Sequence, residues 1–123
     1  MAHLSHVQLL AAWQQQNLEE IKTLIEPEIV AEFVYPDGRV TYGDYNKMIQ
    51  VFEERFATAQ EWNFEIIYKA EREEDAIVIM KITREDDHFN RLEKPSLCLF
   101  TFHAIGHTHK LKRAHFEMGL TDN

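Results

Sequence analysis

The chain has 123 residues, of which 45% are hydrophobic and 28% charged, and its formal net charge is -8. This length and balance predict one globular domain, residues 1–123, that can bury a core without disulfides. The acidic balance argues against a nucleic-acid partner, which requires a basic surface. No stretch approaches the ~20 apolar residues of a membrane span.

The cysteine content and the N-terminal residues favour a cytoplasmic protein. Cys98 is the one cysteine and lies in an apolar run, where a lone thiol usually behaves as a small buried hydrophobe. Residues 1–6 have neither the cationic region nor the long apolar region of a secretory signal.

The chain up to Pro27 predicts two short helices. Ser5 followed by Gln8 fits a capping box, which starts a helix at about Ser5. Asn17 followed by Glu20 repeats that pattern and indicates a break near Asn17. The second helix closes before Pro27, because proline cannot continue a helix.

A hairpin and a longer helix are predicted next. Residues 29–35 are β-branched and aromatic, residues 36–38 (Pro-Asp-Gly) form a turn, and residues 40–42 return as the partner strand. Gly43 and Asp44 then start a third helix. Its apolar residues follow helical spacing: Tyr45, Met48, Ile49, Phe52 and Phe56.

The remaining sequence predicts antiparallel strands at 62–70, 76–82, 97–105 and 110–118, with Arg84–Pro95 as a long exposed connection. Helices followed by a sheet predict an α+β fold, since each layer must bury one apolar face against the other.

Two of these strands, 76–82 and 97–105, are apolar on both faces. One face must cover the helices, and the other, which carries Ile77 and Ile79, has no further helix to cover it. An apolar face of that kind favours a partner, and we expect a homodimer through the open face of the sheet.

The strand at 97–105 allows two registers. In one, Leu99, Thr101 and His103 face the helices; in the other, Cys98, Phe100 and Phe102 do, and His103 lies on the opposite face. A slip of one residue exchanges the two sets, and the sequence leaves both open.

The order of two helices, hairpin, long helix and four strands resembles the nuclear transport factor 2-like superfamily over nearly the whole chain. Trp13, the Pro-Asp-Gly hairpin, Gly43 and the last strand pair carry the resemblance. The chain looks most like the small SnoaL-like bacterial members, related to polyketide cyclases and ketosteroid isomerases. This resemblance implies a cone in which a curved, mainly antiparallel (mixed) sheet wraps around three N-terminal helices.

The resemblance also implies a pocket for a small organic ligand between the sheet and the helices. The residues it would place there are Trp13, Tyr35, Phe52, Phe56, Trp62, His103 and Phe116. The leading hypothesis is a ligand-binding domain without established catalysis. The alternatives are an isomerase, cyclase or hydrolase acting on a lipophilic substrate, and a dimeric interaction module with a filled core.

Candidate catalytic residues follow from what the related isomerases need. Their chemistry requires a carboxylate base beside the hairpin and an acidic donor on the penultimate strand. Residues 33–36 hold no carboxylate, and the penultimate strand offers Thr101 and His103 instead of an acid. An enzyme would therefore depend on His103, whose pKa can cross neutrality in an apolar cavity, and on Glu32.

Two histidine-containing clusters have the residue types of a metal site. His107 and His109 are two residues apart with His115 and Glu117 after them, and residues 86–88 read Asp-Asp-His. The first pair falls at a predicted turn, where strand alternation does not fix the direction of the side chains, and the second lies in a solvated connection. We predict no metal and no cofactor.

Overall fold

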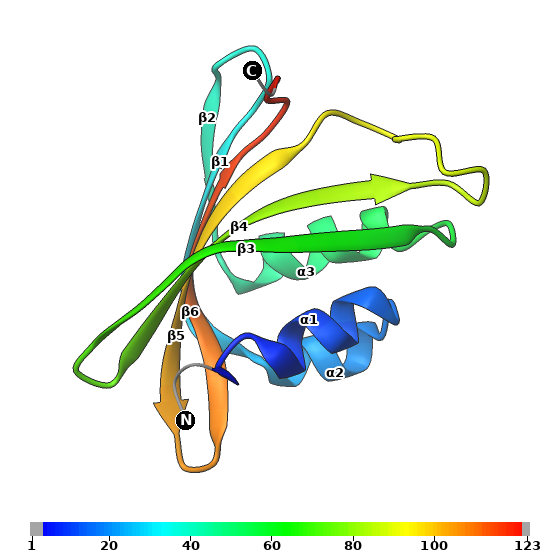
Figure 1. Ribbon diagram of the computed structural model, residues 1–123. Coiled ribbons are helices and arrows are strands. Elements are labelled where there is room, and N and C mark those ends of the chain that lie inside the picture. The colour runs from blue at the N-terminus through cyan, green and yellow to red at the C-terminus, as the bar shows by residue number, and fades with distance from the viewer. Residues whose placement is uncertain (1–3, 122–123) are drawn as a thin grey trace.

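A computed structural model describes residues 4–121 as a curved sheet with three helices on one face (Figure 1). Residues 1–3, part of the segment used above to argue against a secretory signal, lie outside this range. The helices are α1 (Val7–Gln14), α2 (Leu18–Thr23) and α3 (Tyr45–Arg55). The strands are β1 (Ile25–Val34), β2 (Val40–Gly43), β3 (Glu61–Arg72), β4 (Asp75–Glu85), β5 (Ser96–Ile105) and β6 (Thr108–Glu117).

The six strands form one sheet in the order β2-β1-β6-β5-β4-β3. β1 pairs with β6 in parallel, and the other neighbours are antiparallel. The N-terminal hairpin therefore lies beside the last strand. The predicted α+β fold with a mixed, mainly antiparallel sheet is confirmed. Among residues 4–121, none of the helices combines the length and the apolar character that crossing a membrane requires.

Side-chain caps set two of the three helix starts. The Asn17 Oδ1 atom accepts a hydrogen bond from the Glu20 backbone N–H at 3.2 Å, and Asp44 Oδ1 does the same for Lys47 at 3.0 Å. Both satisfy backbone donors that a helix leaves unpaired in its first turn. The predicted starts at Asn17 and Asp44 are confirmed.

The predicted cap at Ser5 is wrong. α1 begins at Val7 after His6, whose side chain makes no capping bond. Ser5 is 2% exposed, and its Oγ atom has no hydrogen-bond partner among the described residues. The serine is taken into the core instead of capping the helix.

The first strand begins earlier than predicted. β1 starts at Ile25 and runs through Pro27, although β2 pairs only with residues 31–34 of this strand. Pro27 therefore has no partner on β2. On the other side of β1, the register against β6 shifts between Ile25 and Val30. A proline is tolerated where a ladder bond is absent.

The turn at residues 36–38 forms as predicted. Gly38 has φ +86°, a conformation that glycine adopts without steric cost, and the Asp37 Oδ1 atom accepts from the Arg39 backbone N–H at 2.9 Å. The turn fixes the β1–β2 register, in which Glu32 pairs with Tyr42.

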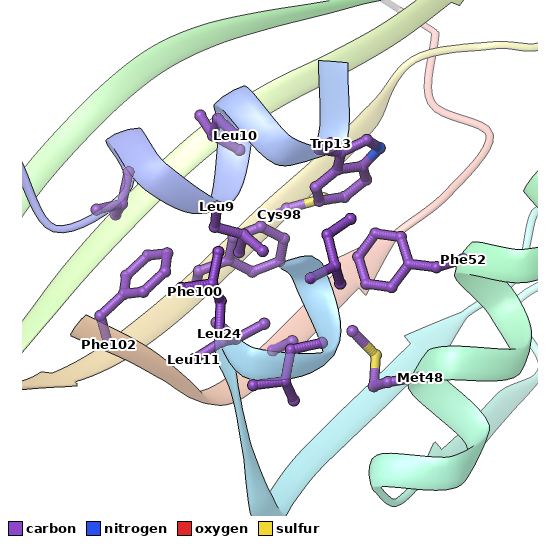
Figure 2. Packing of buried hydrophobic residues seen from close by; sticks show 14 of the residues in the cluster. Leu9, Leu10, Trp13, Leu24, Met48, Phe52, Cys98, Phe100, Phe102 and Leu111 are labelled. Atoms are coloured by element: carbon purple, nitrogen blue, oxygen red, sulfur yellow. The ribbon is translucent and has the colours of Figure 1, made fainter. Parts of the chain in front are cut away.

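The core fills the space between the helices and the inner face of the sheet. Phe100, at its centre, is fully buried, and its ring lies 6.1 Å from that of Trp13 and 5.4 Å from that of Phe116. In Figure 2, Trp13 from α1 and Phe52 from α3 both point toward this region. The sheet therefore adopts the register with Cys98, Phe100 and Phe102 on the inner face.

Candidate ligand-binding site

A cavity of about 150 Å³ lies between α1, α3 and the inner face of the sheet. Trp13, Tyr35, Phe52, Trp62 and Phe116, five of the seven pocket residues expected from the resemblance, line it. The other apolar side chains in its wall are Phe33, Met48, Val51, Ile82, Cys98 and Met118. A ligand here would meet mostly hydrocarbon and aromatic surface, which is usual for small-molecule sites.

Aromatic side chains in the cavity wall contact one another. The Trp13 ring meets Phe52 edge-on at 4.8 Å and Trp62 at 5.5 Å between centroids. Across the cavity, Phe33 and Phe116 stack at 5.0 Å with nearly parallel rings. Edge-to-face and stacked arrangements of this kind are favoured by the aromatic quadrupole, so these contacts stabilise the wall.

Charged side chains gather at one part of the cavity wall. Arg55 at the end of α3 and Arg84 on β4 both contact a single carboxylate oxygen, Oε1 of Glu93, in the connection between β4 and β5. The Arg84 Nε atom lies 2.9 Å from that oxygen, and its Nη1 donates to Gln60 Oε1 at 2.8 Å. The Arg84 guanidinium also lies over the Trp62 ring, 5.8 Å from its centroid. The wall therefore has an apolar part and a cationic part.

Phe56 and His103, the other two expected pocket residues, do not line the cavity. Phe56 follows the last residue of α3, and its ring packs against the cavity-lining rings of Phe52 and Trp62 at 5.6 and 6.3 Å. His103 lies on the outer face of the sheet, where its Nδ1 is 3.1 Å from Asp75 Oδ1. The expectation for His103 is corrected because β5 adopts the register that turns Phe102 inward.

Glu32 also lies on the outer face, away from the cavity, in a cluster with His115 and Glu117. His115 Nδ1 contacts Glu32 Oε1, and its Nε2 lies 2.7 Å from Glu117 Oε2. Burial lowers the pKa of His115, but the hydrogen bonds to Glu117 and Glu32 outweigh it and raise the pKa above the ordinary value. The imidazolium is thus favoured, since it can donate to both carboxylates.

A second outer-face cluster joins Asp75 to Lys112 and His103. The hydrogen bond from Lys112, at 2.9 Å, lowers the pKa of Asp75, and the contact with His103 acts in the same direction. These groups form a structural ion-pair network on the sheet surface. They offer no acid or base to a molecule in the cavity.

We expect the stability of the protein to depend on pH through His115. Because its folded-state pKa is raised, the charged ring stabilises the fold fully below the ordinary pKa of about 6.5, and this contribution disappears as pH rises through the folded-state value. His115→Gln should therefore cost more free energy of unfolding at pH 6 than at pH 9, measured by urea denaturation. The exposed His107, changed to Gln, is the control. An equal cost at both pH values would contradict the role given to the Glu32–His115–Glu117 cluster.

Two chemical candidates remain: the Cys98 thiol, which lines the cavity, and a cluster of metal-ligand side chains that does not. Burial raises the pKa of the Cys98 thiol, which makes the thiolate unavailable at neutral pH. Within residues 4–121, three ligand-type side chains come within 4.8 Å of one another at Asp86, Asp87 and His88, all in the β4–β5 connection.

Sequence reasoning missed Arg55, Arg84 and Glu93. The signal for Arg55 was present: it follows Phe52 by three residues, so it lies on the same face of α3. Nothing in the sequence indicated that Glu93, in a polar connection, folds back to two arginines.

No protein-family model and no curated protein matches the chain. Several solved structures are similar to the chain in fold. A protein of the nuclear transport factor 2-like family from Streptomyces avermitilis has a TM-score of 0.73 at 14% identity, covering 97% of this chain and 94% of that one. A nuclear transport factor 2-like protein of unknown function from Shewanella oneidensis has a TM-score of 0.70 at 13% identity, covering 94% and 98%.

A domain from Nostoc punctiforme, described as having a cystatin-like fold, has a TM-score of 0.67 at 15% identity, covering 94% of this chain and 74% of that one. At such identities the likeness concerns the fold and carries no activity with it. The chain therefore has the nuclear transport factor 2-like, cystatin-like α+β fold.

Proposed function

We propose that this protein binds a small, largely apolar organic molecule in the cavity between α1, α3 and the inner face of the sheet. The observation that carries the proposal is the cavity itself, about 150 Å³ with a mainly aromatic and aliphatic wall. An apolar cavity of about that volume in another protein takes up benzene. A module that works only through its surface would have no need of such a space.

Catalysis is the weaker alternative. His103 and Glu32, the two side chains expected to act as acid and base, are both on the outer face and paired there with other residues. Proton transfer needs a group within hydrogen-bond reach of the substrate. Binding without chemistry therefore fits the cavity better than an isomerase, cyclase or hydrolase.

The proposal is tested by filling the cavity. Val51 lines it from α3 and is partly buried, so Val51→Trp should occupy the space and reduce the affinity for neutral 3-phenylpropanamide at least about tenfold. Binding is followed by chemical-shift titration of the ¹⁵N-labelled protein. Gln50→Trp adds the same side chain at an exposed position of α3 and should leave the affinity unchanged.

Native mass spectrometry of the purified protein adds an independent test, since it reports any organic molecule retained from the cell. If nothing is retained, and neither 3-phenylpropanamide nor the corresponding acid, 3-phenylpropionate, shifts a resonance of the cavity wall, the proposed function is refuted.

We also propose that two copies pair through the outer face of the sheet. Four half-buried hydrophobic residues lie together there, outside the layer that the described helices cover: Ile77, Ile79, Leu97 and Leu99. β6 passes from basic Lys112 and Arg113 to acidic Glu117. A two-fold axis in the plane of the interface and perpendicular to β6 would set the Lys112–Arg113 end of one copy opposite the Glu117 end of the other.

We further propose that, among proteins of this fold, the chain is a member of the SnoaL-like group. We also propose that it is located in the cytoplasm. The last hairpin of small SnoaL-like proteins often carries a Gly-Lys-hydrophobic step, and Lys110-Leu111 resembles that step, although the turn before it is longer. The free, buried thiol of Cys98, in a chain with no second cysteine, supports the cytoplasmic location.

A further inference from the structure

Arg55 and Arg84 share one carboxylate at the cavity wall. Both guanidinium groups contact the same oxygen of Glu93, and the side chains of the three are 29%, 19% and 37% exposed. A guanidinium carries five N–H donors and binds a carboxylate best through two parallel hydrogen bonds. Because the two arginines share one oxygen, each guanidinium can still donate a hydrogen bond to a further anionic oxygen.

The charge of the cavity wall is opposite in sign to the net charge of the whole protein. The chain has a net charge of -8, but the cavity wall holds three cationic side chains, Lys47, Arg55 and Arg84, against two carboxylates, Glu54 and Glu93. The wall thus has one positive charge in excess. Such a local excess selects an anion by direct contact, since long-range attraction by an acidic protein is absent.

Glu93 is the member of this group that can move aside most easily. The arginines extend from α3 and β4, and Arg84 is further held by Gln60 and by the Trp62 ring. Glu93 belongs to the connection between β4 and β5, outside any helix or strand. An incoming carboxylate can therefore replace it without disturbing the sheet or α3.

We propose that the ligand is an amphipathic carboxylate: its apolar body fills the cavity, and its carboxylate takes the place of Glu93 between Arg55 and Arg84. Glu93 then serves as an internal stand-in that keeps the arginines paired while the cavity is empty. This assignment rests on the proposed ligand-binding function and adds the chemical class of the ligand. The apolar part is about the size of one phenyl ring, given the cavity of about 150 Å³.

The test compares 3-phenylpropionate with 3-phenylpropanamide, which have nearly the same shape and differ in charge. Affinities come from chemical-shift titration at fixed salt, because salt screens charge contacts. The acid should bind the wild-type protein about tenfold more tightly than the amide. Working with the ratio of the two affinities removes any effect of a variant on the apolar part of the cavity.

Two variants move this ratio in opposite directions. Glu93→Gln keeps the shape of the side chain but removes the competing charge, so the acid should bind about tenfold more tightly while the amide is unaffected. Arg84→Gln should remove most of the preference for the acid. Asp87→Asn lies in the same connection as Glu93, is exposed, and removes the same charge away from the cavity; it should leave the ratio unchanged.

The outcomes separate this inference from the function on which it rests. If the amide binds in the cavity as tightly as the acid, or Glu93→Gln leaves the ratio where it was, the carboxylate assignment is overturned and the binding function stands. If neither compound binds, both fail. Should Arg84→Gln not fold, as judged by its thermal transition, the Glu93→Gln ratio alone decides.

Discussion

Phe100→Ala is expected to lower the free energy of unfolding by about 3–5 kcal/mol. Phe100 is fully buried at the centre of the sheet, and its ring meets those of Trp13, Phe102 and Phe116. Alanine would leave a void that these rings cannot close, because Trp13 is itself held by Phe52 and Trp62. Since small domains have only about 5–15 kcal/mol of stability, the loss is a large part of the total.

Urea denaturation followed by tryptophan fluorescence measures the effect. Phe89→Ala is the matched control, because Phe89 is 80% exposed and its removal should change stability by no more than about 0.5 kcal/mol. A loss below about 1 kcal/mol for Phe100→Ala would contradict the core described here.

Phe100 also illustrates which features of the fold could be predicted from the sequence and which could not. The order of the helices and strands could be predicted, because the apolar spacing changes from helical to alternating along the chain and the caps at Asn17 and Asp44 are local signals. It could not be predicted which face of β5 points toward the helices. Leu97 and Leu99 are as apolar as Cys98 and Phe100, so alternation fits either register.

Long-range contacts settle that register. The inner set is the bulkier one and fills the space beneath α1, whereas His103 finds Asp75 on the neighbouring strand. The pairing of β1 with β6 in parallel joins opposite ends of the chain, and no local pattern encodes it.

Likewise, one part of the candidate site could be predicted before the structure was known and another part could not. Its aromatic wall could be expected from the resemblance to the nuclear transport factor 2-like superfamily, which implies that Trp13, Phe52 and Trp62 line a pocket; their helical and strand spacing alone indicates only that they are buried. Its cationic part could not, because it depends on a connection that folds back over the cavity to place Glu93 between Arg55 and Arg84.

Ile79→Lys is expected to weaken the proposed dimer by on the order of a hundredfold or more. Ile79 lies on the outer face between Leu99 and Tyr68, in a row of paired residues that crosses the sheet. A two-fold axis places the substitution in the interface twice, and each lysine brings a charge that must lose its water. In a single copy the lysine can extend its ammonium group into solvent, so the fold should persist.

Analytical ultracentrifugation at micromolar concentration gives the dissociation constant, and circular dichroism confirms that the variant is folded. Ala11→Lys introduces the same charge at an exposed position of α1, on the opposite layer of the molecule, and should leave association unchanged. A dimer of unaltered mass in folded Ile79→Lys protein would rule out this face as the interface. A wild-type protein that sediments as a monomer would do the same, while leaving the cavity and its proposed ligand untouched, since none of Ile77, Ile79, Leu97 and Leu99 lines the cavity.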